Sequence, residues 1–281
     1  MTSETGPSPS PAVPGDRGLF GPGSVTWRIM GEPVMWIAGL RALYLQALHP
    51  DVMRGTWQNT ALADPAEAWG RFTRTTEFVR VRIGTTEQVE RAGRRLRKIH
   101  SSLTGVDEQG REFRLDEPEL LLWVHCGEIS SYADIARRSG VPVSRAELDM
   151  FVAEQVRSAE VVGLDPAIVP ASMAALDDYY TGVRPALRAT PEARTALRRS
   201  FIPQLPASLA GLHLVLPPLS TLAFGSLPRW ARRLYGTPAS PITDAATSVA
   251  LRAAYESTAR IPRQVLFFPV RVAARRRRPA A

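Results

Sequence analysis

The sequence contains one cysteine, Cys126, and one lysine, Lys98. A lone cysteine excludes an intramolecular disulfide framework, a zinc ribbon and an iron–sulfur cluster, and it is typical of a reducing compartment. We expect Cys126 to be a small buried apolar residue rather than a thiolate ligand. The first residues show no basic segment followed by an apolar one, so we expect no secretory signal and a cytoplasmic protein.

Several motifs of common enzyme classes are also absent. No G-x-G-x-x-G loop, no G-x-x-x-x-G-K-[ST] loop and no H-E-x-x-H pair occurs, so nucleotide-driven chemistry and zinc hydrolysis have no support in the sequence. The longest apolar stretches, residues 34–48 and 207–227, are interrupted by Arg41 and by His213 with two prolines. Neither stretch predicts a membrane span, although peripheral contact with a membrane stays open.

Positive charge is in excess, because 35 Lys and Arg residues against 27 Asp and Glu residues give a formal net charge of +8. Five of the arginines, Arg271 and residues 275–278, lie close to the C-terminus. We expect residues 1–22 to form a disordered leader and residues 263–281 to form a basic tail, so that both termini are flexible. A solvated tail predicts no specific nucleic-acid partner.

Residues 23–262 carry helical signals and predict a single all-α domain. Capping boxes at Thr85 with Gln88 and at Ser144 with Glu147 predict two helix starts. Residues 105–114 predict a turn or a short hairpin. The expected helices are 33–49, 65–83, 85–103, 116–138, 144–163, 171–183, 191–201, 207–215, 218–235 and 243–259.

Four histidines are the main candidates for chemistry. At about 100° per residue, His100 shares an apolar arc with Val89 and Leu96 on a very basic helix, so we expect it to face the core. Such a residue is either a hydrogen-bonded structural histidine or an axial ligand to iron in an apolar cofactor pocket.

The other histidines differ in their signals. His125 lies four positions from Leu121 and from Ile129, so it faces inward on its own helix. His49 sits at a helix end before a proline, where capping of the last carbonyls is the simplest explanation. His213 carries no further signal.

Arg71, Arg74 and Thr75 share one side of the helix predicted at 65–83. Exposure to solvent is the default interpretation of these side chains. The alternative is that their donors bind haem propionates or polarise bound dioxygen.

Several motifs together resemble a known superfamily. They are LQALHP at residues 45–50, R-x-x-R-T at 71–75, RKIH at 97–100, LLLWVH at 120–125 and EQVRSAEVVGLDPAIVP at 154–170. They are similar to the oxygenase superfamily that groups bacterial latex-clearing proteins, which are rubber oxygenases, with the fungal oxygenase of mycophenolic acid biosynthesis. The resemblance implies an all-helical fold around a b-type haem and an oxidative role.

The resemblance also implies roles for single residues. The resemblance matches Arg71, Arg74 and Thr75 to an arginine, a lysine and a threonine of the latex-clearing proteins, with arginine in place of the lysine. It implies that these three residues and His125 are catalytic. His100 falls near the place of the axial histidine and is the implied iron ligand. His49 and Arg71 are implied cofactor contacts, but His49, His125 or a pair of histidines could bind iron instead.

The sequence therefore predicts a haem b-dependent oxygenase that acts with dioxygen on a small, apolar organic substrate. One alternative is a haem protein that stores, senses or transfers without turnover. The other is a non-catalytic helical protein with structural histidines, whose basic tail meets an acidic partner or a membrane surface.

Overall fold

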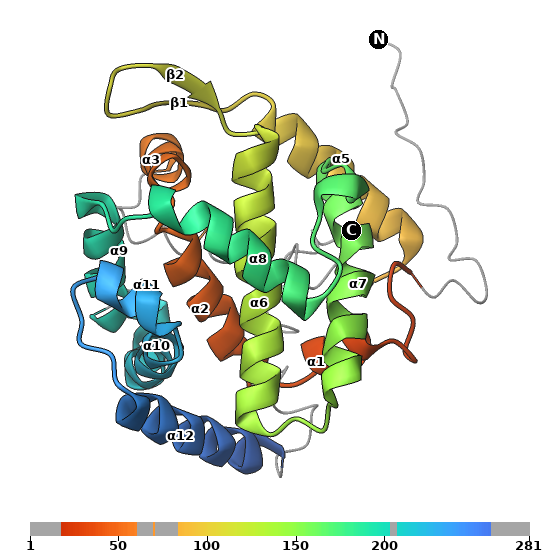
Figure 1. Ribbon diagram of the computed structural model, residues 1–281, viewed down its shortest axis with the longest axis vertical. Helices are drawn as coiled ribbons and strands as arrows, with labels where there is room; N and C mark the ends of the chain where they lie inside the picture. Colours follow the sequence, from red (N-terminus) through yellow and green to blue (C-terminus); the bar gives the residue numbers. More distant parts are fainter. Residues whose placement is uncertain (1–17, 61–69, 71–83, 203–206, 260–281) are drawn as a thin grey trace.

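The computed structural model describes residues 18–60, 70, 84–202 and 207–259 of the chain (Figure 1). Its α-helices are α1 Val25–Met30, α2 Met35–Gln46, α3 Pro50–Asn59, α5 Thr86–His100, α6 Pro118–Ser139, α7 Arg145–Val162, α8 Met173–Val183, α9 Pro191–Phe201, α10 Leu216–Gly225, α11 Arg229–Leu234 and α12 Pro241–Ala259. Short 3₁₀ helices cover Pro166–Ile168, Arg184–Ala186 and Ala207–Leu214. The predicted all-α fold is confirmed.

The predicted turn at residues 105–114 is a small hairpin. Strand β1, Thr104–Val106, pairs antiparallel with β2, Glu112–Arg114, and Gly105 lies opposite Phe113. A side chain at Gly105 would come within 2.5 Å of the Phe113 ring, so the hairpin needs glycine at this close approach.

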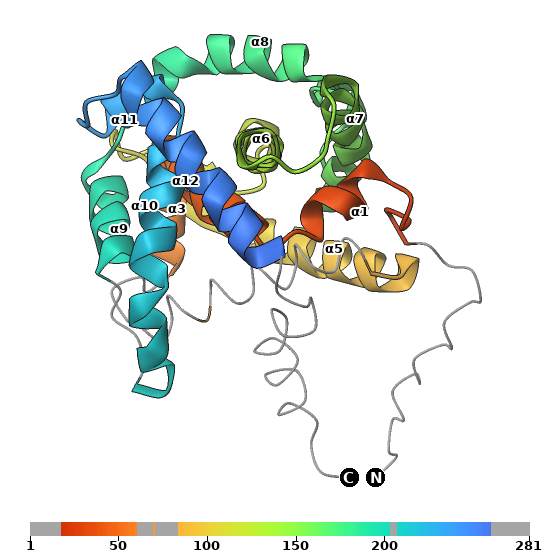
Figure 2. The same ribbon diagram turned by 90° about the horizontal axis from the view of Figure 1, so that it is seen from below.

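Helix α6 is the central element of the fold. Figure 2 looks nearly along this helix and shows the other helices arranged around it. It packs against α2, α7, α8 and α12. Its buried residues, among them Leu121, Trp123, Ile129 and Ile135, occur on every side of the helix, as expected for a helix enclosed by others.

Local signals in the sequence set the ends of the helices next to α6. Both predicted capping boxes are present, at Thr85 for α5 and at Ser144 for α7. Helices α6 and α7 end at Gly140 and Gly163, whose φ angles of 86° and 97° lie in the left-handed region that glycine adopts without strain.

Two expectations about helix boundaries were wrong. The single helix predicted at 218–235 is divided into α10 and α11, because the chain turns at residues 226–228 and Pro228 occupies the N-cap of α11. The segment predicted as an α-helix at 207–215 is a 3₁₀ helix.

The packed body extends to the N-terminal side of α1. Phe20, within the leader predicted at 1–22, is only 2% exposed. Residues 1–17 and the predicted tail at 263–281 lie outside the described residues.

Candidate functional site

His125 lies in the interior, as the sequence predicted. It is 7% exposed on α6, in a stripe with the buried Leu121 and Ile129. A buried histidine suits either a structural role or a place beside a cofactor.

His49 occupies the N-cap position of α3 and not the end of α2, whose last residue is Gln46. Its side chain makes no capping hydrogen bond, so the capping explanation was wrong. The imidazole packs instead against the indole of Trp123, with 6.1 Å between ring centroids.

The environment of His49 favours a neutral imidazole. Burial lowers its pKa, against the opposing effects of the Asp51 and Glu119 carboxylates. Its Nδ1 atom is buried and finds no hydrogen-bond partner among the described residues. A neutral ring with a free nitrogen has the donor chemistry of a metal ligand.

His100 is the last residue of α5 and is half-buried, so it faces the core less completely than its apolar arc predicted. The reason is its place at the helix end, where the neighbouring Ile99 is 43% exposed. The pKa of Asp116 is lowered mainly by the hydrogen bond from Arg114 and to a lesser extent by His100, which places His100 near the start of α6.

The first half of α6 therefore has histidines on different sides. His49 packs on Trp123, while His125 projects about 160° away from Trp123 around the helix axis. His100 approaches from α5, which packs mainly against α7. The structure does not bring these imidazoles into one cluster, and the described residues contain no group of three or more ligating side chains that could hold a bare metal ion.

Arg71, Arg74 and Thr75, the other predicted site residues, lie outside the described residues. Their predicted roles toward a haem and dioxygen stay predictions. His213 lies in the 3₁₀ helix Ala207–Leu214 and is exposed.

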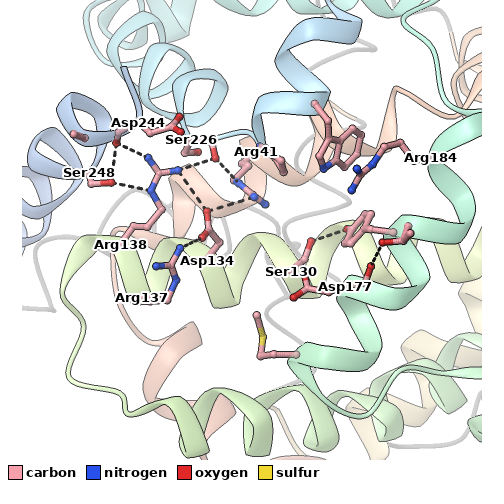
Figure 3. A pocket seen from close by; sticks show the side chains of 16 residues that line it. Arg41, Ser130, Asp134, Arg137, Arg138, Asp177, Arg184, Ser226, Asp244 and Ser248 are labelled. Carbon is pink, nitrogen blue, oxygen red and sulfur yellow. Dashed lines mark hydrogen bonds and ion pairs between the residues drawn. The ribbon is translucent and has the colours of Figure 1, made fainter. Parts of the chain in front are cut away.

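A cavity of about 570 Å³ opens elsewhere, between α6, α8, α11 and α12 (Figure 3). No histidine lines it. Its floor holds an ionic cluster in which Arg41, Arg137 and Arg138 converge on Asp134, as Figure 3 shows. Burial acts to raise the pKa of Asp134, but these guanidinium groups outweigh that effect and hold the pKa below its ordinary value.

Sequence analysis missed this cavity. The one signal was Arg41, which was noted only because it interrupts an apolar stretch. An arginine inside an apolar helix of a soluble protein must find a partner, since an unpaired buried charge is strongly unfavourable. The partner Asp134 is distant in sequence and carries no local signal.

The family follows from a comparison with known proteins. A family model described as the catalytic domain of ER-bound oxygenase mpaB/B'/rubber oxygenase matches residues 27–260. The chain belongs to this family. The match confirms the resemblance inferred from the motifs and identifies the chain as an oxygenase-type oxidoreductase.

The mpaB/rubber oxygenase match includes His49 before α3, the chain between α3 and α5, and helices α5 and α6, so every predicted site residue falls within the catalytic domain. Neither a curated protein nor a solved structure is similar enough to count as a match. Among the described residues, no helix has the length and apolar character needed to cross a membrane.

Proposed function

We propose that the chain is a haem b-dependent oxygenase of the cytoplasm that acts with dioxygen on a small, apolar organic substrate. Family membership supports oxygenase chemistry. The observation that supports haem is the placement of imidazoles around the first half of α6, where His125 is buried and the Nδ1 atom of His49 has no hydrogen-bond partner among the described residues.

The residues present fit a haem better than a bare metal ion. A haem supplies four iron ligands itself and needs one neutral imidazole from the protein, so separated histidines are no obstacle. When bound, haem supplies the redox chemistry of dioxygen activation, while the protein contributes binding, orientation and exclusion of water.

His100 would hold the haem iron. His125, buried in its apolar stripe, would hold or move a proton next to the reacting groups, and His49 would contact the cofactor from the side of Trp123. Since α6 separates His49 from His125, these two residues would not bind the same iron as a pair. Arg71, Arg74 and Thr75 would donate hydrogen bonds to a propionate or to dioxygen.

Haem content of the purified chain tests this proposal. The protein is expressed with iron and a haem precursor, and haem per chain is measured by the Soret absorption and the pyridine haemochrome assay. We expect about one haem per chain in the wild type, as for other proteins with a single axial histidine. His100→Gly should lose most of the haem, and added imidazole should restore the Soret band because it replaces the missing ligand.

His213→Ala is the matched control, because it removes an exposed imidazole that has no proposed role. Circular dichroism checks that each variant is folded. Full haem in His100→Gly, with loss in His125→Ala or His49→Ala, would overturn the assignment of the ligand. A folded wild type that stays colourless and cannot be loaded with haemin would overturn haem dependence.

A further inference from the structure

We propose that the cavity between α6, α8, α11 and α12 is a binding site for a small organic carboxylate with a flat apolar body. It contains none of the residues assigned to the haem site, so the inference goes beyond the proposed function and does not depend on it. The argument has three parts: the charge of the floor, the guanidinium at the rim and the apolar wall.

The floor of the cavity carries more positive than negative charge. Asp134 is contacted by Arg41 at 3.4 Å, Arg137 at 2.6 Å and Arg138 at 3.5 Å. Asp244 is contacted in the same way by Arg229 and Arg232.

Four arginines line the cavity, Arg41, Arg137, Arg138 and Arg184, against three carboxylates, Asp134, Asp177 and Asp244. Arg41 is only 3% exposed, so water screens its charge poorly. Positive charge that is withdrawn from solvent favours an anion in the adjoining cavity.

Arg184 supplies the donor group for that anion. Its guanidinium lies over the indole ring of Trp230, 5.1 Å from the centroid, and both residues line the cavity. This cation–π contact holds the exposed Arg184 guanidinium beside the aromatic wall of the cavity. Within the described residues no ion pair ties Arg184 to a carboxylate, so its fork of donors is available for bidentate contact with a ligand carboxylate.

The wall beside Arg184 is apolar and aromatic. The rings of Tyr180 and Trp230 pack with 5.9 Å between centroids, and Met173 and Pro228 extend the same surface. The Tyr180 hydroxyl is occupied by protein partners, since it donates to the carbonyl of Cys126 at 3.0 Å and pairs at 2.7 Å with the hydroxyl of Ser130, which also lines the cavity. The ligand therefore meets an aromatic surface, and the volume of about 570 Å³ lies in the range of small-molecule sites.

Calorimetric titration of the purified full chain with 2-naphthoate tests the proposal. The neutral 2-naphthalenemethanol and inorganic phosphate serve as comparison probes, since each offers only half of the proposed chemistry. We expect naphthoate to bind about tenfold or more tightly than either, which corresponds to one charge-assisted hydrogen-bond pair or one buried ring.

Arg184→Gln and Trp230→Leu should each weaken naphthoate binding about tenfold. Arg145→Gln is the matched control, because it removes an exposed arginine of α7 that does not line the cavity. Binding of the alcohol or of phosphate as tight as that of naphthoate would overturn the carboxylate assignment. Absence of binding heat, or equal affinity in Arg184→Gln, would overturn the site.

Haem content of the same two variants separates this test from that of the proposed function. We expect it to equal that of the wild type, because both residues line a cavity that no histidine lines. A colourless chain that binds naphthoate would support the carboxylate site and contradict the haem proposal.

Discussion

At the scale of single residues, Arg41 links α2 to α6 through buried polar contacts. Its guanidinium is 3% exposed and donates to the Ser131 hydroxyl at 2.7 Å and to the Ser226 carbonyl at 3.3 Å, and it pairs with Asp134. Each of the three guanidinium nitrogens therefore has a polar partner. Such a charge is tolerated in the interior only while its partners stay in place.

Asp134→Asn removes the carboxylate on which three arginines converge. We expect this change to lower the free energy of unfolding by about 3 kcal/mol, the lower end of the range for breaking a buried ion pair, because the Asp134 side chain is 21% exposed. Urea unfolding at pH 7, followed by circular dichroism, measures the change.

Asp177→Asn is the control for this prediction, since Asp177 lines the same cavity but is exposed and forms no ion pair within the described residues. Its unfolding free energy should stay within about 0.5 kcal/mol of the wild type. An equal loss in both variants would mean that the ionic cluster does not hold α2 on α6.

At the scale of secondary structure, the contact of α5 with α7 depends on Gly93. A Cβ atom at this position would lie 2.6 Å from Cγ1 and 2.7 Å from the backbone oxygen of Val161. The two helices meet there at backbone distance, and Arg97 of α5 donates to the same Val161 oxygen at 2.5 Å. This contact positions the helix that carries His100.

Gly93→Ala should therefore lower the free energy of unfolding by about 1 to 3 kcal/mol, despite the better helix propensity of alanine, because it overpacks this contact. Gly182→Ala is the matched variant in α8, where an added Cβ meets nothing within 4 Å. It should raise stability by up to about 1 kcal/mol. If urea unfolding shows both substitutions stabilising, α5 is not held against α7 as closely as described.

The helices that sequence analysis placed well are those whose ends have local causes. Capping boxes at Thr85 and Ser144 and a left-handed glycine at Gly140 act within a few residues, so the sequence alone reveals them. The break before α11 was missed although Pro228, at the N-cap of α11, is a local signal for it. In α2 the apolar Trp36 and Leu43 are each 38% exposed while Arg41 is buried, so apolar character alone does not identify the buried side of this helix.

The same distinction applies to the candidate site: local sequence patterns predict some of its features, and tertiary packing creates the others. Burial of His125 and Cys126 could be predicted, because their neighbours one turn away on α6 are apolar, and burial raises the pKa of the Cys126 thiol to about 12. The ionic cluster could not, since Arg41, Asp134 and Asp244 come from three helices that are distant in sequence. Only the tertiary fold brings them together.

At the scale of the whole molecule, carboxylates fasten the N-terminal part of the chain to α7. Glu154 accepts a hydrogen bond from the Thr26 hydroxyl at 2.6 Å and from the Thr26 backbone N–H at 2.8 Å. Glu147 accepts from the Ser144 backbone N–H at 2.7 Å and pairs with Arg28 of α1. The ion pair of Glu147 with Arg28 requires an ionised carboxylate, so protonation of Glu147 should loosen α1 and the capping box of α7 together.

Acid should therefore destabilise the fold over a defined range of pH. The backbone hydrogen bond from Ser144, together with Arg28 and the Ser144 hydroxyl, lowers the pKa of Glu147 from 4.5 to about 2. Because the unfolded chain binds this proton more readily, the stabilisation is complete above pH 4.5 and is lost as the pH falls toward about 2.

Urea midpoints measured from pH 7 to pH 2.5 should be level at first and then decline. Glu147→Gln should flatten that decline, whereas Glu160→Gln, an exposed change at the other end of α7, should leave it unchanged. An equally steep decline in Glu147→Gln would show that other carboxylates, such as Asp134, control acid unfolding.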